Sequence, residues 1–143
     1  MYKILTPLSQ SDFERYYKTR WELLRKPWGQ ALDSEKDELE NESIHRMVEV
    51  DNRIIAVGRL HYINKTTAQI RYMAVKQDYE KQGIAKAIYT DLEKEAYTNG
   101  IKLITLNSRE LATGFYEKIG FTVTKKTNLL FNQIQHYEMQ KKL

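Results

Sequence analysis

The sequence predicts a mixed α/β fold, in which a mostly antiparallel sheet contains one parallel strand pair and carries helices on both faces. Two observations predict it. Residues 45–76 alternate apolar and polar side chains and are interrupted at Asp51-Asn52 and Asn64-Lys65, as in an antiparallel meander. Residues 84–106 then pass from a helical apolar period to a short apolar run, and a strand–helix–strand unit requires a parallel pair.

The first part of the chain predicts one strand and two helices. Residues 1–7 fit an edge strand. Residues 12–25 fit a long helix, because their aromatic and aliphatic side chains recur at helical spacing and Ser9 or Ser11 precedes them as a cap. Pro27 falls in the segment that breaks this helix. Residues 34–41 fit a short acidic helix, since negative charge favours a helix start.

The rest of the chain predicts six further strands and two helices. The long helix ends at Asn99-Gly100, and Gly120 ends the last one. Leu111, Ala112, Phe115 and Ile119 should form the buried side of that last helix. We expect strands at residues 45–50, 53–63, 67–76, 101–106, 121–125 and 133–140, and helices at about 83–99 and 109–119.

Length and composition limit the class of protein. At 143 residues the chain fits a single domain, residues 1–143. It has no cysteine, which excludes disulfides, thiol nucleophiles and thiolate metal sites. The formal net charge of +4 is spread along the chain rather than gathered in a basic stripe, so a nucleic-acid partner is not expected. Without an apolar run of about 20 residues or a signal peptide, we expect no membrane partner and a cytoplasmic location.

The segment between the third strand of the meander and the long helix predicts an anion site. The first turn of a helix has unpaired N–H groups and the positive end of the helix dipole. Gly83 and Ala85 would let an anion approach this backbone closely. The same pattern also fits an ordinary turn. Neither G-x-x-x-x-G-K-S/T nor G-x-G-x-x-G occurs, so triphosphatase and dinucleotide folds are not supported.

Two motifs in this order resemble the signatures of the GNAT superfamily of acyl-coenzyme A-dependent N-acetyltransferases. The first, a strand followed by Q/R-x-x-G-x-G/A, matches residues 80–85, although Glu80 stands where Gln or Arg is usual. The second, A-x-x-F/L-Y-x-x-x-G-F, matches residues 112–121. The predicted element order is also similar to that fold, so the resemblance covers nearly the whole chain.

The resemblance implies how the chain would hold acetyl-coenzyme A. Backbone amides of the loop would bind the pyrophosphate, the preceding strand would pair with the pantetheine arm, and the sheet would splay beside this strand to admit the thioester. Arg109, where many members have Asn, would contact phosphate or pantetheine. The implied cofactor-binding residues are Met73, Ala74, Val75, Lys81, Gln82, Gly83, Ile84, Ala85, Lys86 and Arg109.

The resemblance also implies a catalytic tyrosine. Tyr116 would protonate the departing thiolate, although it also fits a core position beside Phe115. The general base is open among acidic and histidine side chains, and we name His61 and His136 as candidates although each also fits a structural role. No metal is expected, because the two histidines lack a third ligand. The full set of base candidates is Glu38, Glu40, Glu42, His45, Glu49, His61 and His136.

These features together predict an enzyme that transfers an acetyl group from acetyl-coenzyme A to a primary amine of a small molecule, peptide or protein. Direct attack in a ternary complex is expected, because no cysteine is present to form an acyl-enzyme. The alternative is a non-catalytic acyl-coenzyme A sensor, which Glu80 favours and Tyr116 opposes. Acetylation of a charged RNA fits less well without a basic patch. A homodimer is compatible with the resemblance.

Overall fold

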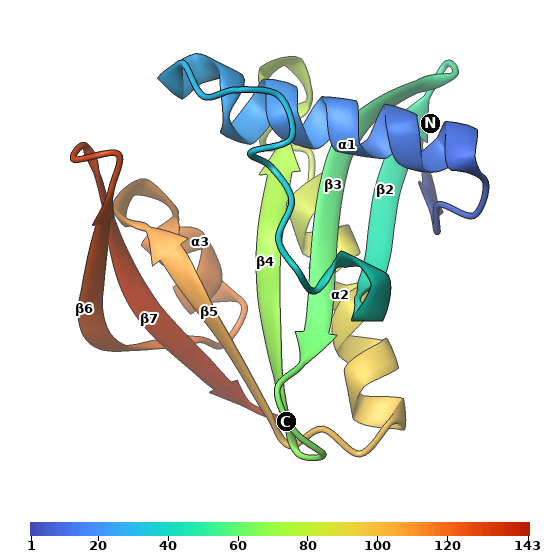
Figure 1. Ribbon diagram of the computed structural model, residues 1–143. Helices are drawn as coiled ribbons and strands as arrows, with labels where there is room; N and C mark the ends of the chain where they lie inside the picture. The colour runs from blue at the N-terminus through green and yellow to red at the C-terminus, as the bar shows by residue number, and fades with distance from the viewer. The chain divides into compact units, whose positions relative to one another are not determined.

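The computed structural model describes all residues, 1–143. Figure 1 shows the course of the chain. The strands are β1 (Lys3–Leu5), β2 (Ile44–Val50), β3 (Arg53–Tyr62), β4 (Thr67–Val75), β5 (Leu103–Arg109), β6 (Thr122–Leu130) and β7 (Ile134–Lys142). The α-helices are α1 (Gln10–Leu24), α2 (Ile84–Thr98) and α3 (Thr113–Lys118), with short 3-10 helices η1 (Lys26–Trp28), η2 (Glu40–Glu42), η3 (Gln77–Tyr79) and η4 (Glu110–Ala112).

The seven strands form one mixed sheet in the order β1-β2-β3-β4-β5-β7-β6. β4 and β5 are parallel, from the pair Thr67–Leu103 to the pair Ile70–Leu106, which confirms the predicted strand–helix–strand unit. The other registered pairs, β1 with β2, β2 with β3, β5 with β7 and β6 with β7, are antiparallel. No helix is both long and apolar enough to cross a membrane.

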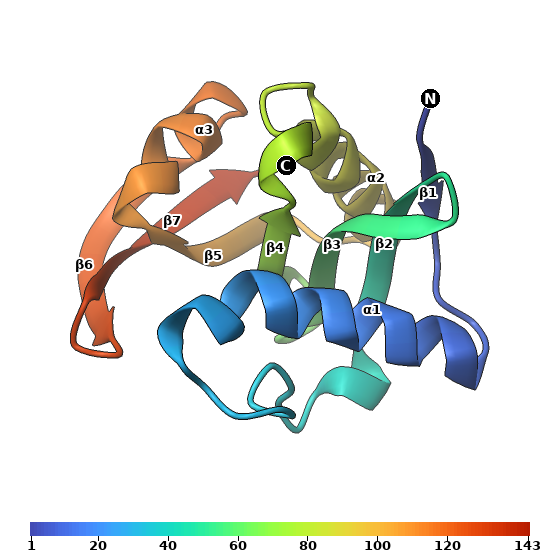
Figure 2. The ribbon, with the colours of Figure 1, turned by 90° about the horizontal axis from the view of Figure 1, so that it is seen from above.

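The chain divides into two compact units, one of residues 1–61 and 72–94, and the other of residues 62–71 and 95–143. In the first unit, α1 and α2 lie on opposite faces of β2 and β3 (Figure 2). Gly58 of β3 permits the approach of α2, because a Cβ there would lie 2.8 Å from Cγ2 of Ile88. Tyr16, Met47 and Val57 are buried in the core cluster that includes α1.

α1 begins where its cap was predicted. The Ser9 side chain accepts from the backbone N–H of Asp12, and the Asp12 carboxylate accepts from the N–H of Ser9, which completes a capping box. The backbone N–H groups of Leu8 and Ser9 both donate to the Asp12 carboxylate, and these bonds lower the pKa of Asp12. The two reciprocal bonds satisfy donors that a helix start otherwise leaves open.

Two predictions about helical segments are wrong, namely the helix at residues 34–41 and the burial of Leu111. Residues 34–41 do not form an acidic helix, because the Glu40 carboxylate turns inward to accept from the N–H of Asp37, and the Asp37 carboxylate accepts from the N–H of Leu39. The helical segment predicted at about 109–119 is present, with η4 starting at Glu110 and α3 at Thr113, while Arg109 ends β5. Leu111 is fully exposed and takes no part in the buried side predicted for it.

Candidate active site

The predicted anion site lies in the first unit, where the chain turns from η3 into α2. Lys81 (φ 62°) and Gly83 (φ 80°) both have left-handed backbone conformations. A Cβ on Gly83 would meet no atom within 4 Å, so the space in front of this backbone is open. α2 has 15 residues, and its first N–H groups have no partner within the helix. The segment therefore presents donors and the positive helix end to solvent, as a phosphate site requires.

The side chains around this turn are consistent with an anionic ligand. Lys81, Gln82 and Lys86 are exposed. Glu80, the residue that departs from the motif, is also exposed, so it need not face a bound anion. A groove of about 630 Å³ starts at Gly83 and follows α2. It is lined by Ile4, Gly83, Lys86, Ala87, Thr90, Asp91 and Lys94.

The strand that leads into this turn has an unusual backbone. Tyr72 has φ 58° in the middle of β4, a conformation that is strained for a bulky residue. Its buried ring packs against three guanidinium groups, with the Cζ atoms of Arg20, Arg59 and Arg25 at 4.2, 5.0 and 5.6 Å from the ring centroid. These cation–π contacts stabilise the ring, and the strained residue immediately precedes Met73, Ala74 and Val75, the predicted pantetheine strand.

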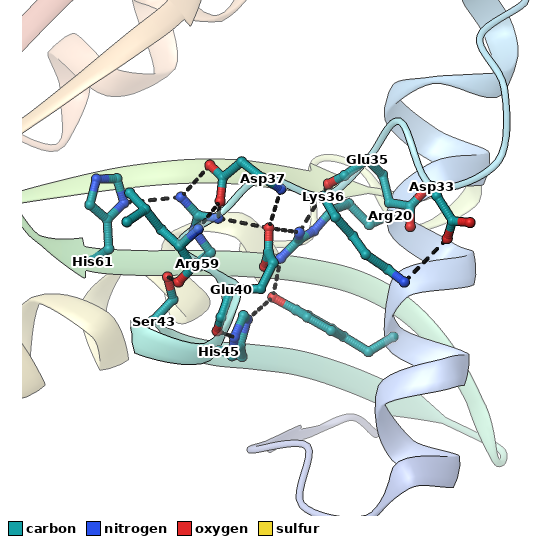
Figure 3. Close-up of polar contacts among 12 residues, drawn as sticks. Arg20, Asp33, Glu35, Lys36, Asp37, Glu40, Ser43, His45, Arg59 and His61 are labelled. Carbon is teal, nitrogen blue, oxygen red and sulfur yellow. Dashed lines mark hydrogen bonds and ion pairs between the residues drawn. The ribbon is translucent and has the colours of Figure 1, made fainter.

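A buried network of charges joins α1, β3 and the segment between them (Figure 3). Oε2 of Glu40 accepts from Nη1 of Arg20 at 2.9 Å and from Nη1 of Arg59 at 2.8 Å. Arg59 also binds both oxygens of Asp37, at 2.7 and 3.0 Å. Both arginines are fully buried. Charges this deep in the protein are stable only when they are paired, so the network fixes the segment before β2.

Sequence reasoning missed this network, although a signal was present. Arg20 lies four residues after Tyr16 and four before Leu24, and so falls on the apolar face of α1. Arg59 lies in a strand whose neighbours from residue 54 to 60 are buried. A cation in an apolar pattern predicts a buried partner, but the sequence does not identify the partner.

The two candidate histidines of the first unit already have partners. Nη2 of Arg59 lies 3.1 Å from Nδ1 of His61. Because a guanidinium only donates, this bond occupies the lone pair of Nδ1 and leaves the proton on Nε2. Nδ1 of His45 lies 2.8 Å from the Tyr16 hydroxyl, and Nε2 lies 2.8 Å from the carbonyl oxygen of Glu40. Burial lowers the pKa of His45. Both rings are placed to support the network.

The second unit contains Tyr116 and Arg109. Tyr116 lies on α3, buried, with its ring at 5.0 Å from Phe115 and 5.7 Å from Phe121 in edge-to-face contacts. Its hydroxyl has no hydrogen-bond partner in the protein. Burial raises the pKa of this hydroxyl, and the positive charge of Arg109 partly opposes the rise. The group therefore stays protonated at neutral pH and retains its donor capacity for a ligand.

His136 also lies in the second unit, opposite Arg109 in the register of β5 and β7. Its Nδ1 lies 3.0 Å from the carbonyl oxygen of Ile134. A carbonyl only accepts, so Nδ1 carries the proton and the lone pair is on Nε2. Either neutral tautomer of histidine has one lone pair, which lies on Nε2 in His136 but on Nδ1, the atom that Arg59 contacts, in His61.

The predicted residues are therefore distributed over both units. The pantetheine strand, the loop from Lys81 to Lys86 and His61 belong to the first unit, and Arg109, Tyr116 and His136 belong to the second. Within the first unit the strand and the loop are consecutive. Within the second, Arg109 influences Tyr116 and faces His136 across the strand pair.

Comparison with known proteins identifies the family. Residues 22–143 match the model of the acetyltransferase (GNAT) domain. An uncharacterized N-acetyltransferase, YjcF of Bacillus subtilis (strain 168), is 27% identical over 139 residues, covering 97% of this chain and 99% of that protein.

Solved structures share the fold. A putative N-acetyltransferase from Lactobacillus plantarum superposes with a TM-score of 0.86 at 19% identity, over 99% of this chain and 98% of that chain. A GNAT family acetyltransferase from Elizabethkingia anophelis, solved with acetyl-CoA bound, gives 0.77 at 16% identity, over 99% and 98%. The chain thus belongs to the GNAT acetyltransferase family and is an acyl-coenzyme A-dependent N-acetyltransferase.

Proposed function

We propose that this protein transfers an acetyl group from acetyl-coenzyme A to a primary amine by direct attack in a ternary complex. The observation that carries the proposal is the open backbone at Lys81 and Gly83, before the first turn of a 15-residue helix. Two features of this segment favour a bound pyrophosphate, namely its unpaired backbone N–H donors and the positive end of the helix dipole. A relative with the same fold was solved with acetyl-CoA bound, which supports this choice of donor.

The residues that would hold the donor are those of the strand and the loop. Met73, Ala74 and Val75 would offer their backbone to the pantetheine arm, and residues 81–86 would offer N–H groups to the pyrophosphate. Arg109 would contribute a further positive charge. Bound acetyl-coenzyme A supplies an activated acyl group and a sulfur leaving group.

The protein would supply an acid and a base. Tyr116 would donate the proton that the leaving sulfur acquires, since its hydroxyl is protonated and has no partner in the protein. His136 would accept a proton from the attacking amine at Nε2, where its tautomer places the lone pair. His61 is the weaker candidate, because Arg59 occupies its Nδ1. No cysteine is present, so the amine itself is the nucleophile in this proposal.

The experiment measures release of the free thiol of coenzyme A from acetyl-coenzyme A across a panel of primary amines, together with calorimetric binding of coenzyme A. We expect binding without an amine, and thiol release only when a suitable amine is added. Initial rates with both substrates varied should intersect, as a ternary complex requires. Parallel lines would contradict direct attack, and failure to bind coenzyme A would contradict the cradle.

A further inference from the structure

A second groove of the first unit lies on the flank of α1, away from the proposed coenzyme loop in sequence. Its volume is about 390 Å³. One wall is a row of side chains at helical spacing on α1, and the other is the segment 32–36. It is lined by Gln10, Phe13, Glu14, Tyr17, Lys18, Trp21, Leu32, Asp33, Glu35 and Lys36.

Glu35 is the unusual residue of this groove. Its side chain is only 3% exposed, and its carboxylate forms no hydrogen bond or ion pair with the protein. Oε1 is fully buried without a partner. Figure 3 shows the Glu35 side chain extending toward α1. A buried carboxylate without a partner is costly, and a bound cation would remove that cost.

The backbone holds Glu35 in this position. Nη1 of the buried Arg20 donates to the carbonyl oxygen of Glu35 at 3.0 Å, and Nε of Arg25 donates to that of Ser34 at 3.1 Å. The indole N–H of Trp21 donates to the carbonyl oxygens of Gln30 and Ala31, at 3.1 Å each. The backbone that carries the Glu35 side chain is therefore held in place before any ligand binds, which lowers the entropy cost of binding.

The aromatic walls suit a positive charge. Phe13, Tyr17 and Trp21 follow one another along α1, and the Phe13 and Tyr17 rings lie 5.8 Å apart. Nζ of Lys36 lies 4.7 Å from the Tyr17 ring centroid, so this ring already accepts a primary ammonium group from the protein itself. Besides this ring contact, the ammonium group of Lys36 forms an ion pair with Asp33 of 3.2 Å, in which the Asp33 side chain is 82% exposed. Such a pair is weak, and Lys36 is replaceable.

We propose that this groove is a binding site for an alkylammonium ion, with Glu35 as the counter-charge, the aromatic rings as walls and Lys36 as an internal occupant that the ligand displaces. The groove is also lined by the carboxylates of Asp33 and Glu14, whose negative charge offsets the positive charge of Lys18 and Lys36. The site does not depend on the proposed acetyl transfer.

The experiment follows amide and indole resonances of the full ¹⁵N-labelled chain during titration with n-butylammonium chloride, at constant ionic strength and without acetyl-coenzyme A. n-Butanol serves as the neutral isostere. We expect saturable shifts at the Trp21 indole and at residues 32–36 with the ammonium ion, and at least about tenfold weaker binding of the alcohol. Equal binding of the two would overturn the proposal.

Variants test whether the Glu35 carboxylate is the counter-charge of the bound ammonium ion. Glu35→Gln should weaken n-butylammonium binding about tenfold or more, whereas Glu14→Gln, which changes an exposed carboxylate of the same groove, should change it less than about twofold. Lys36→Met should strengthen binding about threefold, because the internal competitor is lost. Tyr17→Leu, which removes one aromatic wall, should also weaken n-butylammonium binding and serves as the test if Glu35→Gln does not fold. Unchanged affinity in Glu35→Gln or in Tyr17→Leu would contradict the proposal.

Discussion

Tyr16 and Tyr116 are both buried. In each, burial raises the pKa of the hydroxyl, and the positive charge of a nearby arginine partly opposes this rise. Their hydrogen bonding differs. The Tyr16 hydroxyl contacts Nδ1 of His45 at 2.8 Å and the carbonyl oxygen of Gly58 at 3.2 Å, and accepts from Arg20 at 2.8 Å. The Tyr116 hydroxyl has no partner in the protein. Burial and the direction of the pKa shift therefore do not distinguish the two tyrosines, whereas the number of hydrogen-bond partners does.

The largest expected effect concerns Tyr116. Tyr116→Phe removes a donor that no protein group uses, so the free energy of unfolding should change by less than about 1 kcal/mol. The rate of thiol release should fall about 100-fold or more, since positioned proton donors contribute on that scale. Steady-state kinetics and urea unfolding of the same preparation measure both quantities.

Coenzyme A binding to Tyr116→Phe is the control, because a catalytic donor should alter kcat and leave this affinity nearly unchanged. If the variant retained the wild-type rate but lost stability, Tyr116 would be a core residue like Tyr16.

The second effect concerns Tyr16. Tyr16→Phe leaves His45, Arg20 and the Gly58 carbonyl without a shared partner in a buried site. We expect the free energy of unfolding to fall by about 3 kcal/mol, since each buried polar group left unsatisfied costs about 1–3 kcal/mol. Urea unfolding measures the loss. A loss as small as that of Tyr116→Phe would mean that the hydroxyl network does not stabilise the unit.

The sequence predicted the elements that depend on local pattern and on motif. Ser9 caps α1, Gly83 precedes α2, and the parallel pair of β4 and β5 follows from the strand–helix–strand order. The pairing of Arg20 with Glu40 spans 20 residues and that of Arg59 with Asp37 spans 22. No periodicity encodes contacts at such separations, so the sequence predicts a helix for the acidic segment although its carboxylates are used in these contacts.

The same reason explains which individual residues the sequence predicts. A motif identified Tyr116, whereas the strained Tyr72 and the buried Glu35 carry no sequence signal, because both depend on side chains that only the folded chain brings together.

A third, smaller effect compares two glycines that have the same backbone conformation, only one of which belongs to the proposed coenzyme A site. Gly83 (φ 80°) and Gly100 (φ 83°) have the same backbone conformation, and a Cβ on either would meet no atom within 4 Å. Alanine at either position should therefore lower the free energy of unfolding by about 1 kcal/mol. Only Gly83→Ala should weaken coenzyme A binding, by several-fold, because only that methyl group would stand in front of the proposed cradle. Calorimetry compares the two variants, and equal affinities would remove Gly83 from the site.

The smallest effect tests whether the hydrogen bonds around Tyr16 respond to pH. Burial lowers the pKa of His45 below its ordinary value of 6.5, and the charges of Arg20 and Arg59 act in the same direction, while Glu40 opposes them through its carbonyl and its carboxylate. The unfolded chain then binds more protons than the folded chain just below pH 6.5, so this contribution to stability is complete above pH 6.5 and is lost as the pH falls.

Urea unfolding at pH 7, 6 and 5 should show the free energy of unfolding falling with pH in the wild type, by at most about 1.4 kcal/mol per pH unit for one proton. His45→Gln keeps an amide that can bond to Tyr16 and Glu40 but does not titrate, so its slope over the same interval should be smaller. Asp12, whose pKa is also lowered, titrates below this interval and does not contribute. Equal slopes in the two proteins would mean that protonation of His45 does not change the free energy of unfolding, which would contradict the lowered pKa of His45.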